Sequence, residues 1–514
     1  MSHATIASSP FLEHYRCPAV FGDFRVEEKL SADKGYFRFG PQAICYGKSS
    51  SGFRAPKATA PLHDVLSDVR IDGRKLILPF CPADVLTNLR HEHYARPQQN
   101  GRVHTPGGSA ALQRAYYLLR PLLGVSVRKH LQRRSLRNWK NISFPSWPVD
   151  CTVERVHEGL MSLALRAHAV ERIPFIWFWP DGHQSCASMT HDIETRAGRD
   201  FCAQMMDLDE AHGIKSAFQV VPEERYAVPQ QFVNYIRNRG FEVNVHGLNH
   251  QGDLFGDRDA FLRQVERINM HGRAYQANGF RSPVLYRNAD WFDSLEFAYD
   301  MSIPNVAHLD PQRGGCCTVM PFFIGKLLEL PVTTTQDYSL FHILDHYSTE
   351  VWEQQLATIQ ENHGMASFIV HPDYVIEPRA RKTYKKLLER LADLRSRSQV
   401  WLALPGEVNR WWRQRSKMTL RPRGDSWEIE GEGKERAQVA YAKVEGNRVV
   451  YRLQAILGPC ALEEPLAGLF GFFFLALCLL VSIATAGVRT YGLGGPDCVI
   501  EGGANSQKRA PSIA

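Results

Sequence analysis

Three ionisable side chains stand directly after one short apolar run, and two more follow another. His191, Asp192 and Glu194 come after CASMT, and His246 and His250 come after FEVNV. The two histidines of HGLNH are four residues apart, so on a helical turn their imidazoles lie on one face and can bind one metal ion. Two imidazoles and a carboxylate from another strand form the three-ligand set of a hydrolytic zinc centre, with positions left for water.

Repeated β/α units must position these side chains. From about 170 to 416, helical stretches end near a glycine and short apolar strands follow, with left-handed helix caps expected at Gly213, Gly240 and Gly364. This alternation predicts an α/β fold with parallel strands, and about 245 residues is the size of one β/α barrel. Because the active site of such a barrel lies at the carboxyl ends of its strands, Arg281 after ANGF and His371 after SFIV are expected on the same rim.

Four successive motifs carry a family resemblance: THDIE (190–194), HGLNH (246–250), GFRSP (279–283) and FIVHP (368–372). In this order they resemble the motifs of the NodB-homology polysaccharide deacetylases, carbohydrate esterase family four. That family consists of metal-dependent hydrolases that remove N- or O-acetyl groups from sugars on a distorted β/α barrel. The resemblance implies the same fold and activity here. The first motif departs from the usual pair of consecutive aspartates and is similar to the branch that reads Asp-x-Asp or Asp-x-Glu.

The resemblance also implies the residues of a metal site. Asp192 is the expected base, and the expected ligands of one divalent ion, for which zinc is favoured, are Glu194, His246 and His250. Alternation along an extended strand puts Asp192 and Glu194 on the same face, so their roles could be exchanged. Gly247 stands where an HExxH motif has its glutamate, which argues against a zincin protease.

The resemblance implies two further catalytic residues. Arg281 matches the family arginine that keeps the catalytic carboxylate ionised and oriented, and His371 matches the histidine that protonates the leaving amine. The expected reaction is hydrolysis of the acetyl carbon–nitrogen bond of a sugar, oligosaccharide or polysaccharide. Two alternatives remain open: a non-catalytic, membrane-anchored carbohydrate-binding protein, and a metal-independent cyclic-amide hydrolase on the same barrel.

The rest of the chain divides into three predicted segments. Residues 1–145 form a predicted N-terminal α+β region of unknown role, with short β-rich runs up to about 90 and a helical, basic stretch over 110–141. Residues 418–456 are predicted to form a small β appendage. Residues 466–488 carry no charge over a length that can cross a bilayer, which predicts a transmembrane helix. Because the N-terminus lacks the pattern of a secretory signal, this helix would leave the barrel in the cytoplasm.

Composition excludes several classes of protein. The chain has 514 residues, 44% of them hydrophobic, which suits a globular protein with a sizeable core. Its 61 basic and 54 acidic side chains leave a net charge of +7, too mild for a dedicated nucleic-acid binder. Its 11 cysteines include no CxxC pair, which indicates reduced thiols rather than a disulfide framework or a zinc ribbon.

Overall fold

Parallel strands form the main sheet of the structure, a computed structural model that describes residues 10–51, 55–95, 125–424 and 426–454. The strand order is β12-β13-β11-β10-β9-β8-β7-β14, and β15 also pairs with β7. Neighbouring strands are parallel except β12 and β13. The bounds are β7 (Ser185–Asp192), β8 (Ala217–Val220), β9 (Glu242–His246), β10 (Gly279–Arg281), β11 (Tyr299–Asp300), β12 (Phe322–Ile324), β13 (Leu327–Glu329), β14 (Met365–Ile369) and β15 (Val400–Leu402). The prediction of an α/β fold with parallel strands is confirmed.

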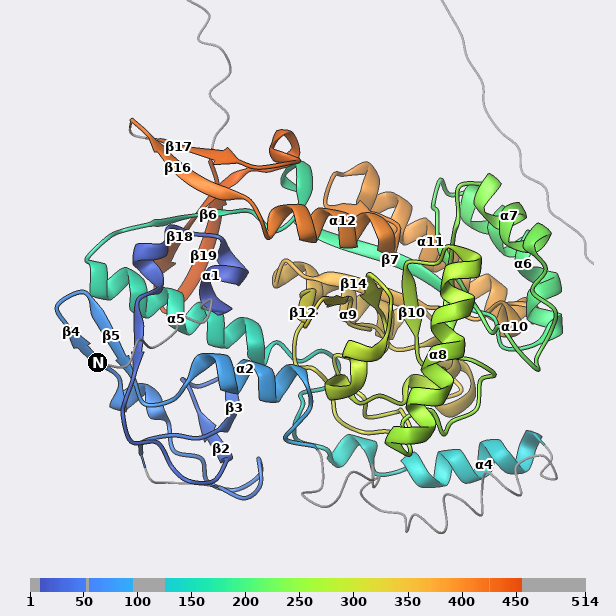
Figure 1. Ribbon diagram of the computed structural model, residues 1–514, viewed down its shortest axis with the longest axis horizontal. Helices are drawn as coiled ribbons and strands as arrows, with labels where there is room; N and C mark the ends of the chain where they lie inside the picture. The colour runs from blue at the N-terminus through green and yellow to red at the C-terminus, as the bar shows by residue number, and fades with distance from the viewer. Residues whose placement is uncertain (1–9, 52–54, 96–124, 425, 455–514) are drawn as a thin grey trace, which may run out of the picture. The chain divides into compact units, whose positions relative to one another are not determined.

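The sheet curls but does not close into a ring. In the described part of the chain no pairing joins β12 to β14, the two ends of the strand order. Helix α12 and helix α4 lie on opposite sides of the strands, near their two ends (Figure 1). The predicted barrel is therefore present as a curled half-barrel.

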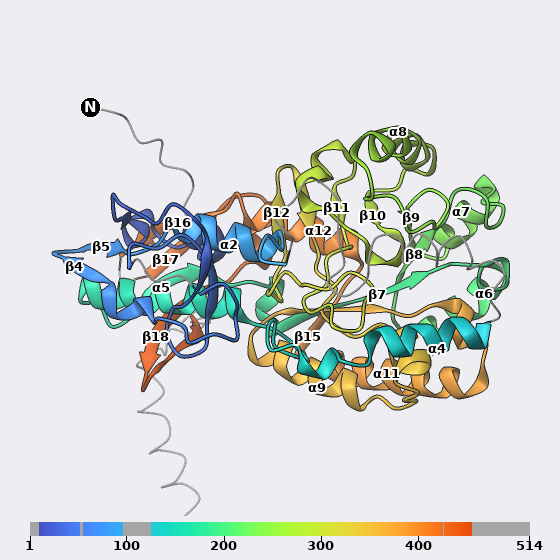
Figure 2. The same cartoon turned by 90° about the horizontal axis from the view of Figure 1, so that it is seen from below.

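Amphipathic helices cover the sheet. Figure 2 shows α8 on one flank and α9 and α11 on the opposite flank. Helix α11 begins with Pro378, a residue well suited to the first turn, and buries Tyr384, Leu387, Leu388 and Leu391, which share one face at helical spacing. The bounds are α6 (Arg196–Glu210), α7 (Gln230–Asn238), α8 (Arg258–Tyr275), α9 (Glu350–Glu361), α10 (Pro372–Val375), α11 (Pro378–Ser396) and α12 (Pro405–Arg415).

Two of the three predicted left-handed glycines occur as expected. Gly213 and Gly240 have φ values of 64° and 79° after their helices. The prediction for Gly364 is wrong, because the preceding residue, His363, takes the left-handed conformation with φ of 54°. Gly364 serves close packing instead, since a Cβ there would lie 2.5 Å from Cγ2 of Val319.

Residues before and after the half-barrel contribute a second buried cluster. Strand β6 (Ile173–Ile176) pairs with β18, so the sequence just before the half-barrel joins the C-terminal strands. Trp179 is fully buried in this cluster and donates its indole N–H to the His363 carbonyl at 2.6 Å. It therefore packs in the core. The other elements are α1 (Pro10–Tyr15), β1 (Phe24–Val26), β2 (Gly35–Arg38), β3 (Ile44–Gly47), β4 (Arg70–Asp72), β5 (Lys75–Leu78), α2 (Pro82–Arg90), α4 (Val125–Leu136), α5 (Thr152–His168), β16 (Thr419–Arg423), β17 (Ser426–Glu430), β18 (Val439–Glu445) and β19 (Arg448–Leu453).

The prediction of membrane association is corrected by the structure. No helix among the described residues is both long and apolar enough to cross a membrane. Residues 466–488, on which the predicted transmembrane helix falls, lie outside the described residues. The structure therefore gives no support to the predicted membrane partner or to the localisation inferred from that helix.

Candidate active site

The carboxyl ends of four parallel strands carry the predicted side chains. Asp192 is the last residue of β7, His246 the last of β9 and Arg281 the last of β10. His371 caps α10 just after β14. In the register of the sheet, Arg281 lies opposite His246, and all four side chains are buried. The structure therefore gathers them at one edge of the sheet.

A buried ion pair fixes the charge of Asp192. Arg281 donates from Nη1 to Asp192 Oδ1 at 2.7 Å and from Nε to the carbonyl of Met301 at 2.9 Å. Burial alone would raise the pKa of Asp192, but the guanidinium of Arg281, together with His246 and His371, outweighs it and lowers the pKa. Asp192 is thus a carboxylate at neutral pH, held in one orientation by its arginine partner.

Backbone conformation brings the two histidines of HGLNH together without a helical turn. Gly247 and His250 both adopt left-handed conformations, with φ of 62° and 58°, and residues 247–250 form no helix. The imidazole rings of His246 and His250 lie 5.0 Å apart between centroids, at an interplanar angle of 63°. The proximity predicted from the spacing is present, but its cause is two positive φ angles and not helical periodicity.

Each of these histidines faces one carboxylate. His246 Nδ1 lies 3.2 Å from the Arg281 carbonyl oxygen, which can only accept, so Nδ1 holds the proton and Nε2 a lone pair. That Nε2 lies 3.8 Å from Asp192 Oδ2. His250 Nε2 lies 3.1 Å from Glu194 Oε1, yet this buried nitrogen makes no hydrogen bond within the described residues.

Glu194 occupies the most open position of the cluster. Its side chain is 26% exposed, whereas those of His250 and His371 are only 4% exposed. Burial would raise its pKa, but the neighbouring histidines, His250 foremost, lower the pKa well below the ordinary value. Tyr374 donates its hydroxyl to Glu194 Oε2 at 3.3 Å. A substrate that approaches from solvent would therefore meet Glu194 first.

Asp337 is a site residue that the sequence analysis missed. Its Oδ1 lies 2.6 Å from His371 Nδ1, and its Oδ2 accepts from the His371 backbone N–H at 2.8 Å. Burial lowers the pKa of His371, but Asp337, Glu194 and Asp192 outweigh burial and raise it to about 10. His371 is therefore an imidazolium at neutral pH, with Nε2 directed toward Glu194 Oε1 at 3.6 Å.

The donor atoms are of the kinds that bind a divalent metal ion. Burial, opposed by Asp192, lowers the pKa of His246 to about 4, so this imidazole is neutral, as a metal ligand must be. His250 adds a buried nitrogen without a hydrogen bond, and Glu194 adds a carboxylate. These donors lie in two pairs, Asp192 with His246 and Glu194 with His250. Among the described residues, the set whose three donor atoms all lie within 4.8 Å of one another is elsewhere: His91, His93 and Asp290.

His191 does not belong to the site. It is completely buried, with Nδ1 2.9 Å from the Val370 carbonyl oxygen and Nε2 3.0 Å from Asp209 Oδ2. Because side chains alternate along a strand, His191 points to the side of β7 opposite Asp192. It has a structural role in packing α6 against the sheet.

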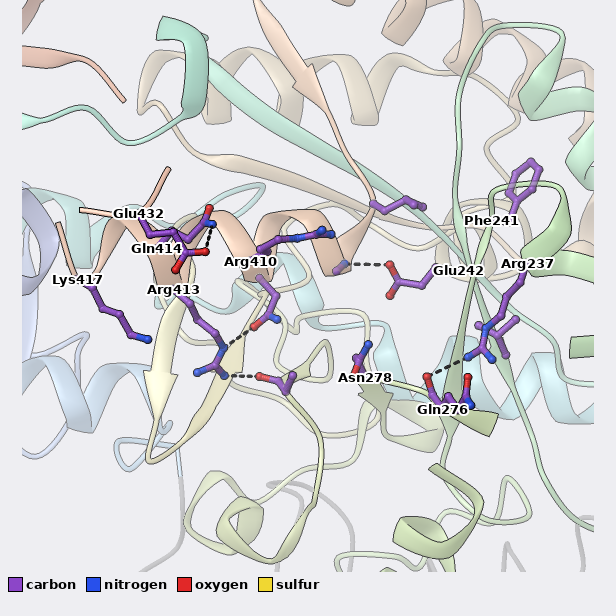
Figure 3. A pocket seen from close by; sticks show the side chains of 15 residues that line it. Arg237, Phe241, Glu242, Gln276, Asn278, Arg410, Arg413, Gln414, Lys417 and Glu432 are labelled. Atoms are coloured by element: carbon purple, nitrogen blue, oxygen red, sulfur yellow. Dashed lines mark hydrogen bonds between the residues drawn. The ribbon is translucent and has the colours of Figure 1, made fainter. Parts of the chain in front are cut away.

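A separate cavity of about 700 Å³ lies at the amino ends of the strands (Figure 3). It is lined by Glu242 at the start of β9 and by Arg410 and Arg413 of α12. His246 is the last residue of the same strand, and at about 3.3 Å per residue it lies about 13 Å away. This cavity is therefore not part of the candidate active site.

Comparison with known proteins gives likenesses among solved structures alone. No family model and no curated protein matches the sequence. The chain is similar to a putative polysaccharide deacetylase from Mycobacterium smegmatis, at 16% identity over 46% of this chain and 93% of that chain, with a TM-score of 0.39. It is also similar to Puue allantoinase, at 14% identity over 46% of this chain and 92% of that chain, with a TM-score of 0.34. A probable polysaccharide deacetylase from Pseudomonas aeruginosa PAO1 is similar at 14% identity over 46% of this chain and 92% of that chain, with a TM-score of 0.33.

Proposed function

We propose that this protein is a carbohydrate deacetylase that hydrolyses the acetyl amide or ester of N- or O-acetylated sugars. One observation carries the proposal: a carboxylate that stays ionised and an imidazole that stays protonated at neutral pH lie at the same edge of the sheet. Arg281 keeps Asp192 ionised, and Asp337 keeps His371 protonated. Hydrolysis of an amide needs such a pair, because water must lose a proton and the amine must gain one.

Asp192 is the proposed base. Arg281 engages Oδ1, so the carboxylate presents Oδ2 toward the His246 side of the site. A water molecule held there can transfer its proton to Asp192 as it attacks the acetyl carbonyl carbon. Because Arg281 is fully buried and also bonded to a backbone carbonyl, the orientation of Asp192 is set before substrate binds.

Glu194, His246 and His250 are the residues that would hold a divalent ion, with zinc the best fit to two nitrogens and one oxygen. Bound there, the ion supplies Lewis-acid activation of water and stabilises negative charge on the acetyl oxygen. The exchange of roles between Asp192 and Glu194 is disfavoured by Arg281, which engages Asp192 rather than Glu194.

His371 is the proposed acid. An amine leaves a tetrahedral carbon readily only when it is protonated, and His371 Nε2 carries a proton at neutral pH. Asp337 binds the opposite ring nitrogen and the backbone N–H, so the ring can present Nε2 to the substrate without rotating.

Aromatic side chains cluster around Tyr374, whose hydroxyl donates to Glu194, and such a cluster suits sugar binding. The Tyr374 ring lies 4.9 Å from the His371 ring, 4.6 Å from His342 and 5.8 Å from Tyr338, between centroids. Flat aromatic faces can pack against the apolar faces of sugar rings while their polar edges remain available for hydrogen bonds. We expect the sugar to lie along Tyr374.

A metal-independent amide hydrolase is the second candidate. The 3.1 Å separation of His250 Nε2 and Glu194 Oε1 favours it, since a proton shared by this pair would satisfy both groups without an ion. The two candidates differ in one measurable property. A deacetylase of the proposed kind loses activity when its metal is removed and regains it with zinc, whereas the alternative is unaffected.

Acetate release from a panel of N-acetylated oligosaccharides and O-acetylated sugars tests the proposal. We expect wild-type protein to release acetate and Asp192→Asn to lose this activity while it keeps its metal. His63→Ala is the matched control, because His63 pairs with Asp68 in the N-terminal region, outside the site. The proposal fails if no acetylated sugar is hydrolysed by metal-loaded protein, or if Asp192→Asn remains active.

A further inference from the structure

Two histidines of the N-terminal region face an aspartate beside the half-barrel. His91 and His93 directly follow α2, and Asp290 lies in a short helical segment, Ala289–Ser294. Asp290 Oδ1 lies 3.2 Å from His91 Nδ1 and 3.1 Å from His93 Nε2. The three donor atoms all lie within 4.8 Å of one another. The side chains are 18%, 25% and 44% exposed, so an ion can enter from solvent.

The hydrogen bond at Nδ1 of His93 determines which ring nitrogen of this residue carries the proton. His93 Nδ1 lies 3.0 Å from Asn88 Oδ1. The orientation of this amide is fixed, because Lys34 donates to Oδ1 at 2.8 Å and Asn88 Nδ2 donates to the Tyr46 carbonyl at 3.1 Å. Since Oδ1 accepts, Nδ1 of His93 must carry a proton. In the neutral imidazole, Nε2 therefore directs a lone pair at the carboxylate oxygen of Asp290.

Two lone pairs that face each other repel unless a proton or a cation lies between them. Charge-assisted hydrogen bonds between nitrogen and carboxylate are typically about 2.7–2.9 Å long, shorter than both contacts to Asp290. For a tetrahedral zinc ion with ligands at about 2.0–2.1 Å, the donor atoms are separated by about 3.3 Å. The observed 3.1 Å and 3.2 Å are close to that separation. In both contacts the same oxygen, Asp290 Oδ1, faces a ring nitrogen, as it would if all three atoms bound one ion.

The backbone holds these donors in place. Glu92, between the two histidines, points inward and forms a buried ion pair with Arg287, whose Nε donates to Oε2 at 2.7 Å. Arg287 precedes Asp290 by three residues, so the buried pair joins the same two segments as the histidines do. Glu92 Oε1 also accepts from the Gly315 N–H at 2.6 Å. His91 and His93 therefore stay on the outer side of this contact, directed at Asp290.

We propose that His91, His93 and Asp290 form a zinc site, distinct from the candidate active site. Two neutral imidazoles and one carboxylate match the ligand preference of zinc, and a water can complete four-coordination. The site would tie the end of α2 to the segment that follows β10, two parts of the chain about 200 residues apart. Because no substrate group is invoked, its proposed role is structural, and it does not depend on the proposed function.

Zinc content tests this site directly. The full chain is stripped of metal, loaded with zinc, dialysed and analysed for bound zinc per chain. We expect Asp290→Asn to bind about one equivalent less than wild type, because it loses the anionic ligand with almost no change of shape. His93→Ala should show the same loss. His63→Ala is the matched control, since His63 pairs with Asp68 at 2.7 Å and is not one of the three proposed ligands, and it should bind as much zinc as wild type.

A second measurement separates this site from the candidate active site. In the His246→Ala background, zinc should still raise the thermal midpoint of unfolding, and adding Asp290→Asn should abolish that increase. Deacetylase activity should survive in Asp290→Asn alone, so failure of this site and failure of the proposed function give different results. Equal zinc content in wild type, His93→Ala and Asp290→Asn, with equal zinc-induced stabilisation, would mean that a proton and not a metal joins these residues, and the proposal would be wrong.

Discussion

Asp337 binds His371 at two points, with Oδ1 2.6 Å from the ring Nδ1 and Oδ2 2.8 Å from the backbone nitrogen. Both residues are buried, so the interaction is strong and the imidazole has one orientation. The contact joins the end of β14 to a segment 34 residues earlier. It gives His371 both its charge and its direction.

Removal of the Asp337 charge should impair amide hydrolysis more than ester hydrolysis. Asp337→Asn loses the carboxylate that keeps His371 protonated, so we expect kcat/KM for an N-acetyl sugar to fall about 10²–10⁴-fold. An activated aryl acetate should be affected far less, because a phenolate leaves without a proton. Asp68→Asn, which breaks the surface pair with His63, is the control and should change neither rate. Equal losses on both substrates would rule out the acid role of His371.

The Asp192–Arg281 pair should be visible in stability as well as in activity. Asp192→Asn leaves the fully buried guanidinium of Arg281 without its counter-ion, which is expected to lower the free energy of unfolding by about 3–5 kcal/mol. Adding Arg281→Met removes the unpaired charge and should restore part of that loss. Urea denaturation of the single and double variants measures both effects. No recovery in the double variant would show that the two side chains do not depend on each other.

A pair of glycine variants tests how the backbone brings His246 and His250 together. Gly247 has φ of 62°, and a Cβ there would lie 2.3 Å from Pro283 Cγ, so Gly247→Ala should displace the motif and reduce metal binding and activity. Gly73 has φ of 59° with no atom within 4 Å of a Cβ. Gly73→Ala therefore has the same backbone strain, about 1–2 kcal/mol, without the collision. Equal metal binding and equal activity in the two variants would show that the backbone at Gly247 does not position the two histidines.

Glu154 predicts a pH dependence of stability. Burial, opposed by the hydrogen bond from Thr318, raises its pKa to about 7, above the ordinary value of 4.5. The folded protein therefore holds this proton more tightly than the unfolded chain does, and the stabilisation is lost as pH rises from about 4.5 to 7. At about 1.4 kcal/mol for each pKa unit, the ionised form costs on the order of 3 kcal/mol. Relative to wild type, Glu154→Gln should gain that stability between pH 4.5 and 8 in urea denaturation, and a difference independent of pH would disprove the assignment.

Local sequence patterns predicted part of the site but not the contacts that set the pKa values and orientations of its residues. Asp192 and His246 stand at strand ends because apolar runs define strands, and parallel strands end at the same edge. Asp337 gave no such signal, since it lies in a helical turn just before Ser339–Ile343, follows no apolar strand, and reaches His371 only through the tertiary fold. Only the structure shows that His191 points away from the site to Asp209.

Other features needed conformations that a single sequence does not reveal. The helical turn expected for HGLNH is replaced by positive φ at Gly247 and His250. The segment HEHY forms a turn in which Glu92 has a positive φ of 58°, so alternation along an extended segment does not explain why His91 and His93 face one carboxylate. The third residue of that site, Asp290, lies about 200 residues away, and nothing local predicts the contact.

Metal-dependent acetate release by the wild-type protein and His250→Ala tests the central claim most directly. Both proteins are stripped of metal, loaded with zinc, and assayed on the same N-acetylated oligosaccharide, with zinc content measured in parallel. The account predicts that the wild type is inactive without metal and active with zinc, and that His250→Ala binds about one zinc less and stays inactive in both states. Full activity of the metal-free wild type, or of His250→Ala, would contradict it.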